Sequence, residues 1–474
     1  MSKNKTRNNL IYSITYKLIM TIQPLIIAPY ISRILGAEGL GKYTFSFAIV
    51  GYFVMFTMLG VNNFGNRSVS QVRDNREKLS STFINIYTLQ LIAGAISVSA
   101  YVFFIILYDN DIVFILQVFL IISSMFDITW FFFGLEQFKL TVLRNTIIKT
   151  VSIIAILLFV NEETDLWIYV IIMSGGALLS QLLLWLFVKN HINFVKPSVK
   201  EMKKMIKPNL TLFIPVVAIS LYRQMNKIML GIASTMTQVA LFENAARINQ
   251  LPLGLLTSVS AVMLPKMSNM VIQGSEDEVK KFIGKSMTGV MLFAFATAFG
   301  LAAIAEDFAP LFFGKEFKMS GTLIVYTSPS IIIMAWANVI RTQYLIPYER
   351  DRIYIISILS AAILNITFNI FALSRWGAVG AAWGVVLAEA IVAIYQSWAV
   401  RKELNIKRYL KDSMIFFISG VLMYMSVRFF VSLFSLEGWI MIGVKVLTGA
   451  IVYFGIVGFW FVGLKKIKFS RIYF

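Results

Sequence analysis

The chain contains no cysteine and only one histidine, His191, among its 474 residues. It therefore has no disulfide, no thiol nucleophile and no Cys/His metal cluster, and its one histidine lies in a basic segment that does not resemble a Ser-His-Asp triad. Carboxylates are also scarce, with 24 Asp and Glu against 43 Lys and Arg. The adjacent acids Glu162 and Glu163 lie in a short turn and are interpreted as solvated. The sequence thus predicts neither a metal nor a cofactor.

Charged residues make up only 14% of the chain, whereas 58% is hydrophobic and 14% is aromatic. A soluble domain of this length normally carries fewer apolar residues. A helix needs about 20 apolar residues to cross a hydrocarbon core of about 30 Å, and such stretches recur along the whole chain. The sequence therefore predicts an all-α integral membrane protein with fourteen transmembrane helices. Their expected bounds are 9–35, 43–66, 81–107, 112–135, 140–160, 166–188, 208–233, 237–265, 282–305, 320–346, 353–374, 377–400, 412–435 and 439–464.

The positive charges follow a membrane topology, because cytoplasmic loops are enriched in Lys and Arg. From a cytoplasmic N-terminus with Lys3 and Arg7, basic segments such as 189–207 and 465–471 alternate with acidic loops such as 161–165. We expect both termini on the cytoplasmic side. The formal net charge of +19 then reflects topology, with some attraction to anionic lipid headgroups, and does not indicate nucleic-acid binding.

One stretch, GAEGLGKYT at 36–44, differs at one position from the glycine-rich loop that cradles ATP phosphates, because Tyr43 stands where a Ser or Thr hydroxyl would hold Mg²⁺. A long apolar stretch precedes it, and not the short strand that such a loop requires. If the first span runs outward, this stretch is the external hairpin between spans one and two, which ATP does not reach. Its glycines are expected to let two helices turn back closely.

The sequence contains a weak internal repeat, which is typical of transporters built from two similar halves. YISRILGAEGLGKYTFSFA at 30–48 matches LYRQMNKIMLGIASTMTQVALFENA at 221–245 in the order Tyr, Arg, Leu-Gly, short loop, aromatic residue. Span seven is then the equivalent of span one. The predicted organisation is an N-terminal six-helix bundle at 1–189, a basic cytoplasmic linker at 190–207, a second six-helix bundle at 208–400, and helices 13 and 14 with a basic tail at 401–474.

Several motifs resemble those of the Wzx-type polysaccharide transporters of the multidrug/oligosaccharidyl-lipid/polysaccharide exporter superfamily. They are RILGAEGLGKYTFSFAIVGYF (33–53), LGVNNFGNRSVSQVRDNREKLS (59–80), NKIMLG (226–231), ENAARINQLPLGLL (243–256), VMLPKMS (262–268) and WGAVGAAWGVVLAE (376–389). The motifs are loose one by one, but they occur in order over nearly the whole chain. One departure is Asn226, where many relatives have an Asp; if that acid couples transport to an ion in them, this chain couples elsewhere or does not couple there.

The resemblance implies two pseudo-symmetric six-helix bundles around a central cavity, plus two C-terminal helices, with alternating inward-open and outward-open states. The implied substrate is an undecaprenyl-pyrophosphate-linked oligosaccharide, flipped across the cytoplasmic membrane of a bacterium for capsule or other surface polysaccharide. Membrane lipids, a polysaccharide polymerase and glycosyltransferases are the expected partners.

Charges inside the apolar stretches are the candidate site residues, because each costs on the order of 3 kcal/mol or more unless it faces a cavity or a partner. Lys17 on span one and Arg247 on span eight are expected near mid-membrane, and Arg223 on span seven in the outer third. Arg and Lys suit a diphosphate, which accepts charge-assisted hydrogen bonds. We expect these three residues to hold the pyrophosphate, with Lys227 and Arg33 near the exit.

Other intramembrane charges have competing interpretations. Arg33, Lys227, Arg428 and Lys445 are also close enough to the outer face to extend their charges into water.

The acids are the second set. Glu243 is expected to pair with Arg223, and Asp127 with Lys149, unless Asp127 is a protonatable group linked to transport. Glu389 on span twelve is either protonated in the core or the acid that couples transport to an ion.

The predicted function is therefore a lipid-linked oligosaccharide flippase and not an enzyme. An ion-coupled exporter of cationic drugs is the alternative, although acids should then dominate the cavity. A membrane polysaccharide polymerase is a further alternative, but it would need a large catalytic outer loop or paired acids for a metal, and the longest outer loop expected here is only about 306–319.

Overall fold

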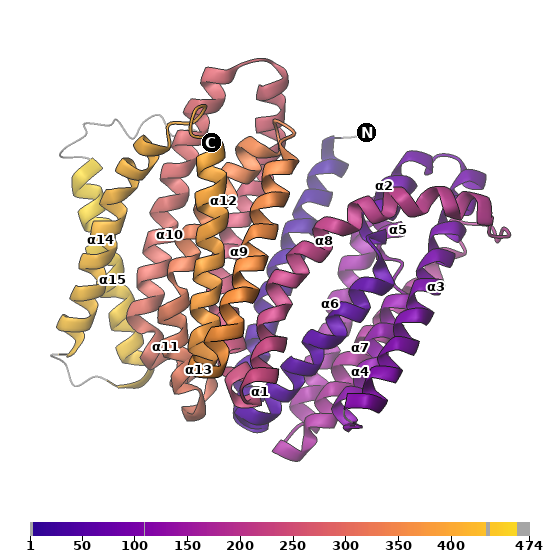
Figure 1. The fold of residues 1–474 in the computed structure, drawn as a ribbon, viewed down its shortest axis with the longest axis horizontal. Helices are drawn as coiled ribbons and strands as arrows, with labels where there is room; N and C mark the ends of the chain where they lie inside the picture. Colours follow the sequence, from indigo (N-terminus) through magenta and orange to yellow (C-terminus); the bar gives the residue numbers. More distant parts are fainter. Residues whose placement is uncertain (1–2, 109, 433–436, 462–474) are drawn as a thin grey trace. The chain divides into compact units, whose positions relative to one another are not determined.

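The computed structural model is helical throughout the regular elements of the residues that it describes, which are 3–108, 110–432 and 437–461 (Figure 1). The α-helices are α1 (Lys3–Met58), α2 (Val61–Val72), α3 (Arg76–Tyr108), α4 (Ile112–Met125), α5 (Thr129–Gly134), α6 (Phe138–Phe159), α7 (Leu166–Val188), α8 (Val199–Ala233), α9 (Met236–Ile272), α10 (Glu276–Phe313), α11 (Lys318–Thr327), α12 (Pro329–Ile340), α13 (Asp351–Ala399), α14 (Ile406–Ser432) and α15 (Gly438–Phe459). The shorter helical segments are η1 (Glu163–Asp165), η2 (Lys315–Phe317) and η3 (Arg341–Leu345).

The helices have the length and the exterior of membrane spans. Among the described residues, nine helices are long and apolar enough to cross a membrane, and a tenth span results if the bent pair Lys315–Thr327 and Pro329–Leu345 is counted as one. Large apolar side chains cover their outer faces, as Ile96, Phe103 and Leu107 do on α3, and such a surface requires lipid around it. The prediction of an all-α integral membrane protein is confirmed. The count of fourteen spans is consistent with these helices and stays a prediction.

Two long helices are each broken at a glycine. α1 breaks at Gly36 (φ 65°, ψ 179°), and α13 breaks at Gly377 (φ 50°, ψ −129°). Glycine has no Cβ and adopts such backbone angles without strain. Each break separates two predicted spans, so the two long helices are hairpins of membrane length.

The second predicted span ends earlier than expected. Leu59 (φ 41°) and Gly60 (φ 82°) interrupt the chain after Met58, and residues 61–66, predicted as membrane span, begin the polar helix α2 instead. The positive φ angles end the helix within an apolar run, and Leu59 is not a residue from which such a break is expected.

The glycines of GAEGLGKYT serve close packing. A Cβ on Gly41 would lie 1.8 Å from the carbonyl oxygen of Met236, at the start of α9. A Cβ on Gly231 would lie 2.2 Å from the ring of Phe45. The two hairpins matched by the internal repeat therefore pack directly on each other. The turn expected over 36–44 is confined to Gly36, because residues 37–44 are helical. Lys42, the residue in the position of a phosphate-binding lysine, forms an ion pair with Asp111.

By internal packing the chain divides into two compact units, Met1–Ala240 and Leu241–Phe474. This division differs from the one predicted from the repeat, since α8 packs against α1, α2 and α3 of the first unit. Residues 199–207, predicted as part of a linker, form the first turns of α8. This segment is rich in lysine, as loops often are, but its apolar and polar residues have helical spacing. Met202 and Asn209 are the buried positions of that pattern.

The core of the first unit contains an aromatic cluster that holds α2, α3, α5 and α7 together. The ring of Phe83 lies 4.7 Å from that of Phe131 and 5.6 Å from that of Trp130. Gly65 of α2 faces the indole of Trp130, where a Cβ would lie 2.4 Å from a ring carbon. α2 and the short α5 therefore interlock in a way that larger side chains would prevent.

The predicted span 112–135 is broken between α4 and α5, and side chains from other helices satisfy the exposed carbonyl groups. Gln90 Nε2 donates to the carbonyl oxygens of Ser124 (2.7 Å) and Asp127 (2.9 Å), while Gln90 Oε1 accepts from Trp130 Nε1. Trp185 Nε1 donates to the carbonyl of Phe126. A helix end inside an apolar environment needs such partners.

The core of the second unit is built from α9, α10, α12, α13, α14 and α15. It contains the buried side chains of Met287, Met291, Tyr344 and Tyr453. Tyr453 on α15 donates from its hydroxyl to the carbonyl of Leu292 on α10, at 2.8 Å. The C-terminal helices are thus packed on the second unit by both apolar contacts and hydrogen bonds.

Candidate functional site

The five predicted pyrophosphate residues lie on three helices. Arg33 is exposed on α1, three residues before the break at Gly36, and Lys227 is half-buried on α8 of the same unit. Arg247 lies on α9 in the second unit. Lys17 is on α1 and Arg223 is on α8, but their side chains are outside the described part of the structure. The grouping of the five residues into one site therefore stays a prediction.

Arg247 has a carboxylate partner one helical turn away. Its Nε lies 3.0 Å from Glu243 Oε1, and the two side chains are only 21% and 13% exposed (Arg247 and Glu243). Residues four apart share one face of a helix, so α9 supplies both charges. Glu243 was expected to pair with Arg223, whose side chain is outside the described part. The described pairing places a carboxylate and a guanidinium in direct contact on one face of α9.

A line of hydrogen bonds continues from this pair along α9. Asn249 donates to Thr327 on α11, and Asn338 on α12 donates from Nδ2 to Ser260 Oγ at 2.6 Å. Arg341 in η3 then donates to Asn338 Oδ1 at 2.6 Å. α9 is therefore joined to α11 and α12 by polar contacts within an apolar unit. Such contacts are costly to leave unsatisfied in lipid, so they fix the register of the helices.

Arg341 itself was not predicted as a site residue, although it lies inside the expected span 320–346. Its guanidinium also lies 5.3 Å from the ring centroid of Tyr354 on α13, a cation–π contact. The sequence pattern that could have identified it is simple, because any arginine inside a predicted span is a candidate.

Arg144 on α6 is a second residue of this kind and is buried in the first unit. One terminal nitrogen donates to the carbonyl of Ser180 (2.9 Å) and to Gln181 Oε1 (3.0 Å), and the other donates to Asn145 Oδ1 (2.6 Å). These contacts are to neutral oxygens of α6 and α7. They hold the two helices together.

The ion pair expected between Asp127 and Lys149 stays a prediction, and the described contact of Asp127 is a local one. Asp127 Oδ1 accepts from the backbone N–H of Thr129 at 2.8 Å and so caps the start of α5. Lys149 is half-buried on α6. The break between α4 and α5, which was not predicted, gives this carboxylate a local partner.

Glu389 is buried, at 6% exposure, in the second half of the α13 hairpin. Small residues bring the two halves together: a Cβ on Gly384 would lie 2.5 Å from Asn369 Oδ1. Further along, Gln396 Nε2 donates to Ser357 Oγ at 2.9 Å. Glu389 therefore lies between two polar contacts of a tightly packed hairpin, as a carboxyl group enclosed within the second unit.

Two cations that were interpreted as extending to the outer face are paired with α10. Arg428 on α14 lies 2.6 Å from Glu306 Oε2, and Lys445 on α15 forms an ion pair with Asp307. The adjacent acids of α10 thus attach both C-terminal helices. Lys445 is buried, so this side chain does not reach water as expected.

Comparison with known families gives a match that covers more than half of the chain. Residues 6–271 match the family model described as polysaccharide biosynthesis protein. The chain belongs to this family. Among curated proteins, it is 24% identical over 409 residues to the Escherichia coli (strain K12) protein named "Putative O-antigen transporter", covering 85% of this chain and 98% of that protein.

Another curated protein aligns less completely. The Haloferax volcanii protein named "Probable low-salt glycan biosynthesis flippase Agl15" is 20% identical over 271 residues, or 57% of each chain.

Solved structures share the fold. The lipid II flippase MurJ in an inward closed conformation superposes with a TM-score of 0.76 at 15% identity, covering 96% of this chain and 99% of that one. An inward-facing multidrug resistance MATE family transporter superposes with a TM-score of 0.65 at 14% identity, covering 85% and 99%. At these identities the likeness shows the fold alone. This polysaccharide biosynthesis family member therefore has the helical architecture of those two transporters.

Proposed function

We propose that the protein is a flippase that moves undecaprenyl-pyrophosphate-linked oligosaccharide repeat units from the cytoplasmic to the outer leaflet by alternating access. The observation that carries the proposal is the alignment over 98% of the length of a protein named as an O-antigen transporter. The apolar exterior of the helices and the arginines inside them agree with this function. The polyprenyl chain stays in lipid, and the sugars and the diphosphate cross along the protein.

In this proposal Arg247 exchanges one anion for another. Without substrate, Glu243 neutralises the guanidinium at 3.0 Å. A diphosphate carries more negative charge than a carboxylate and forms paired hydrogen bonds with a guanidinium. The substrate therefore displaces Glu243 from Arg247, and the ion pair between Glu243 and Arg247 forms again when the substrate leaves. This exchange stabilises the empty transporter and keeps its affinity for substrate moderate.

The other cations of the proposed diphosphate site are Lys17, Arg223, Lys227 and Arg33. Arg33 lies just before Gly36 on α1, and Lys227 lies just before Gly231 on α8. Both are therefore near the end of a predicted span. We place them at the exit, where they attract the diphosphate away from Arg247. Glu389 is the proposed acid for coupling transport to an ion, since it is the carboxyl group enclosed in the α13 hairpin.

A second candidate function is ion-coupled export of cationic drugs. It is favoured by the likeness to a MATE family transporter and by two acids inside the helices, the half-buried Glu243 and the buried Glu389. In that function Glu243 would bind the cation directly, and Arg247 would compete with the drug for it. The two candidate functions therefore predict opposite effects of removing Arg247.

Transbilayer movement in proteoliposomes tests the proposal. Sugar exposure of a polyprenyl-diphosphate oligosaccharide is read with an external enzyme for wild type and for Arg247→Gln at matched protein levels. Arg428→Gln is the control, because it removes another arginine that is paired with a glutamate. We expect the first variant to lose at least about tenfold in rate, as for one missing charge-assisted contact, and the control to stay near wild type.

Two other outcomes separate the candidates. Movement by wild type that Arg247→Gln leaves unchanged retains the flippase function but removes Arg247 from the site. Absence of movement with several oligosaccharides, combined with faster drug efflux in Arg247→Gln, would establish the drug exporter in its place.

We further propose that the protein lies in a bacterial cytoplasmic membrane with both termini in the cytoplasm, beside the polymerase and glycosyltransferases of the same polysaccharide. Because the chain has no cysteine, a single introduced cysteine is the only thiol that a reagent can label. An impermeant thiol reagent should label Glu163→Cys in intact cells and Lys196→Cys only after the membrane is opened. The reverse pattern would invert the topology.

A further inference from the structure

The first turns of α8 carry three distinct faces. Met202, Asn209 and Phe213 are buried, and at 100° per residue they fall within about 40° of arc. Val199, Ile206 and Leu210 fall within the next arc of about 40° and are 62%, 42% and 43% exposed. The basic face follows directly and consists of the exposed residues Lys200, Lys203, Lys204 and Lys207.

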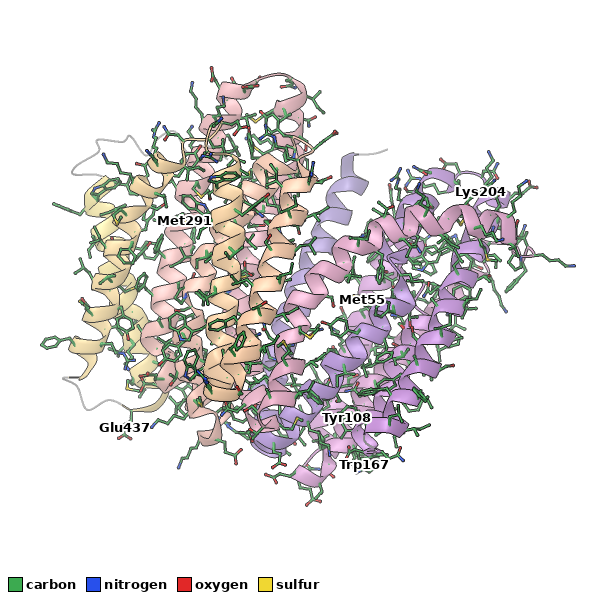
Figure 2. The ribbon with its side chains drawn as sticks, viewed as in Figure 1. Met55, Tyr108, Trp167, Lys204, Met291 and Glu437 are labelled. Atoms are coloured by element: carbon green, nitrogen blue, oxygen red, sulfur yellow. The ribbon has the colours of Figure 1, made fainter. Side chains whose placement is uncertain are left out.

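This part of α8 lies across the ends of neighbouring helices of the first unit. Figure 1 shows α8 starting at the right of the view, passing across that unit, and then turning along its helices. Its buried face packs on α2 and α3. Lys204, labelled in Figure 2, is near the end of the unit where α8 begins.

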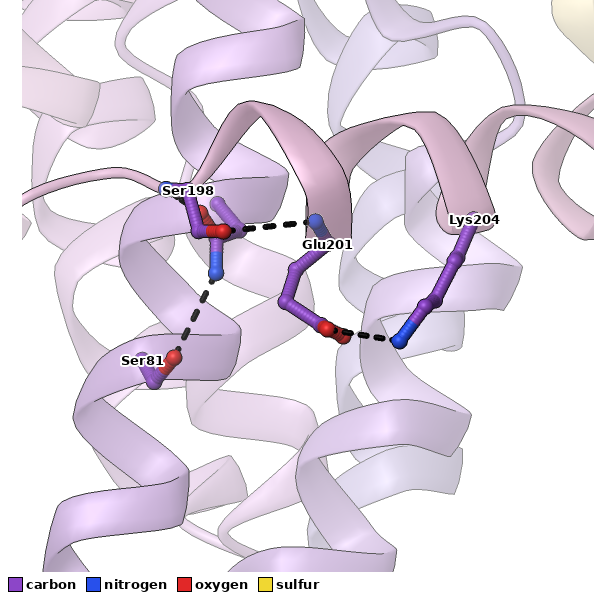
Figure 3. A network of polar contacts seen from close by, with 5 residues as sticks. Ser81, Ser198, Glu201 and Lys204 are labelled. Atoms are coloured by element: carbon purple, nitrogen blue, oxygen red, sulfur yellow. Dashed lines mark hydrogen bonds and ion pairs between the residues drawn. The ribbon is translucent and has the colours of Figure 1, made fainter.

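The start of α8 is fixed to α3 by a hydrogen-bond network (Figure 3). The backbone N–H of Ser198 donates to Asn85 Oδ1 at 2.7 Å, and Asn85 Nδ2 donates to Ser81 Oγ at 3.3 Å. Ser198 Oγ caps the helix by accepting from the N–H of Glu201. These contacts set the rotation of α8 about its axis, so its apolar and basic faces have fixed directions.

An exposed apolar stripe beside a basic stripe matches a membrane surface that carries negative charge. The apolar side chains of such a helix enter the boundary between headgroups and acyl chains, while lysines extend their charges to the phosphates. A dissolved anion would need the lysines but not Val199, Ile206 and Leu210. Phe194, in the segment before the helix, is 85% exposed and adds to the apolar surface.

We propose that residues 194–210 form an interfacial site for anionic phospholipid headgroups, with the first turns of α8 lying flat in the headgroup layer. The site requires only that the chain lies in a membrane, and it is independent of the substrate that is transported. Clusters of four or more lysines next to a transmembrane helix bind acidic lipid. Each lysine that reaches the headgroups increases the affinity about fivefold.

The test uses the full chain in phosphatidylcholine nanodiscs with a fluorophore on Ile206→Cys, the sole cysteine of that variant. Quenching by brominated phosphatidylglycerol is compared with quenching by brominated phosphatidylcholine. We expect the phosphatidylglycerol to be preferred at least about fivefold, and the preference to fall as salt rises. Lys200→Gln/Lys203→Gln/Lys207→Gln should abolish it without disturbing the pair between Lys204 and Glu201, at 2.7 Å.

Two further variants make the result specific. Lys281→Gln/Lys315→Gln/Lys402→Gln removes the same charge from exposed lysines of the second unit and should keep the preference. Lys200→Arg/Lys203→Arg/Lys207→Arg should also keep it. Equal quenching by both lipids in the wild-type background, or a preference that survives the loss of the three lysines of α8, would overturn the proposal. Displacement by inorganic diphosphate beyond the effect of sodium chloride would assign the face to a soluble anion instead.

Discussion

Arg144 in the first unit and Arg247 in the second are both arginines inside apolar helices, and their hydrogen-bond partners differ. Arg144 donates to the carbonyl of Ser180 and to amide oxygens of α6 and α7. Arg247 lies against the carboxylate of Glu243. A guanidinium held by neutral oxygens has its geometry fixed and keeps its charge. A guanidinium held by a carboxylate forms a neutral pair, and another anion can take the place of the carboxylate.

We infer a structural role for Arg144, and the exchange of anions at Arg247 is our proposal. The difference between their partners explains why a count of intramembrane charges is insufficient to find a site. The partner decides whether a cation fixes two helices or binds a ligand. The three predictions that follow test this difference, from the largest expected effect to the smallest.

Arg144→Leu should give the largest loss of stability. It removes the guanidinium that donates to the Ser180 carbonyl and to Gln181 Oε1, at about 1–3 kcal/mol for each group left unsatisfied, while Asn145 Oδ1 still accepts from the Ser180 hydroxyl. Thermal unfolding in nanodiscs measures the loss. Arg144→Lys should lose less stability, because an ammonium replaces part of the hydrogen bonds of the guanidinium. The control Arg352→Leu, at an exposed position, should unfold near the wild-type temperature. Unfolding of Arg144→Leu at the wild-type temperature would show that the neutral partners are not stabilising.

Asp307→Asn should have the next largest effect. It leaves Lys445, whose side chain is 9% exposed, without its carboxylate, and an uncompensated buried charge is strongly unfavourable. Glu306→Gln should cost less than about 1 kcal/mol, because Arg428 and Glu306 are 37% and 42% exposed.

Proteolysis near α14 and α15 reports how firmly the C-terminal helices are attached. The double variant Asp307→Leu/Lys445→Met should recover most of the resistance, since a packed apolar pair replaces a buried ion pair at little cost. Equal sensitivity of Asp307→Asn and Glu306→Gln would contradict the assigned difference in burial.

The smallest effect on stability is expected for His191, which lies in the basic segment between α7 and α8. Burial, and then the charge of Arg76, lower the pKa of this imidazole. The folded protein therefore keeps it neutral where the unfolded chain takes up a proton. Its contribution to stability is complete above about pH 6.5 and is lost as the pH falls from there toward the lowered pKa of the folded state. Compared with His191→Gln, the wild type should lose about a degree more in Tm on acidification. A pH dependence that is identical in both would exclude this role.

Much of the fold follows from the sequence, because length and apolar content are local properties. The breaks at Gly36 and Gly377 were predicted as span ends, since glycine and charge interrupt the apolar runs there. The break between α4 and α5 was missed because FDITWFFF contains neither Pro nor Gly. It is stabilised by Gln90 and Trp185 from α3 and α7, which no local pattern reveals.

The site was less predictable for a related reason. Position in a span gives the depth of a charge but not its neighbours. Glu243 and Asp127 were assigned partners on other helices, and the contacts each makes within its own segment were not predicted. Arg144 and Arg341 were overlooked although they lie in predicted spans. The first turns of α8 were taken for a linker because lysine is common in loops and in exposed helix faces alike.

The exchange at Arg247 is the central claim, and binding of a polyprenyl-diphosphate oligosaccharide in nanodiscs tests it most directly. Glu243→Gln removes the competing carboxylate and keeps the shape of the side chain, so the account predicts at least about tenfold tighter binding than wild type, whereas Arg247→Gln binds at least about tenfold more weakly. Binding that Glu243→Gln leaves unchanged or weakens would contradict the claim that substrate and Glu243 compete for the same guanidinium.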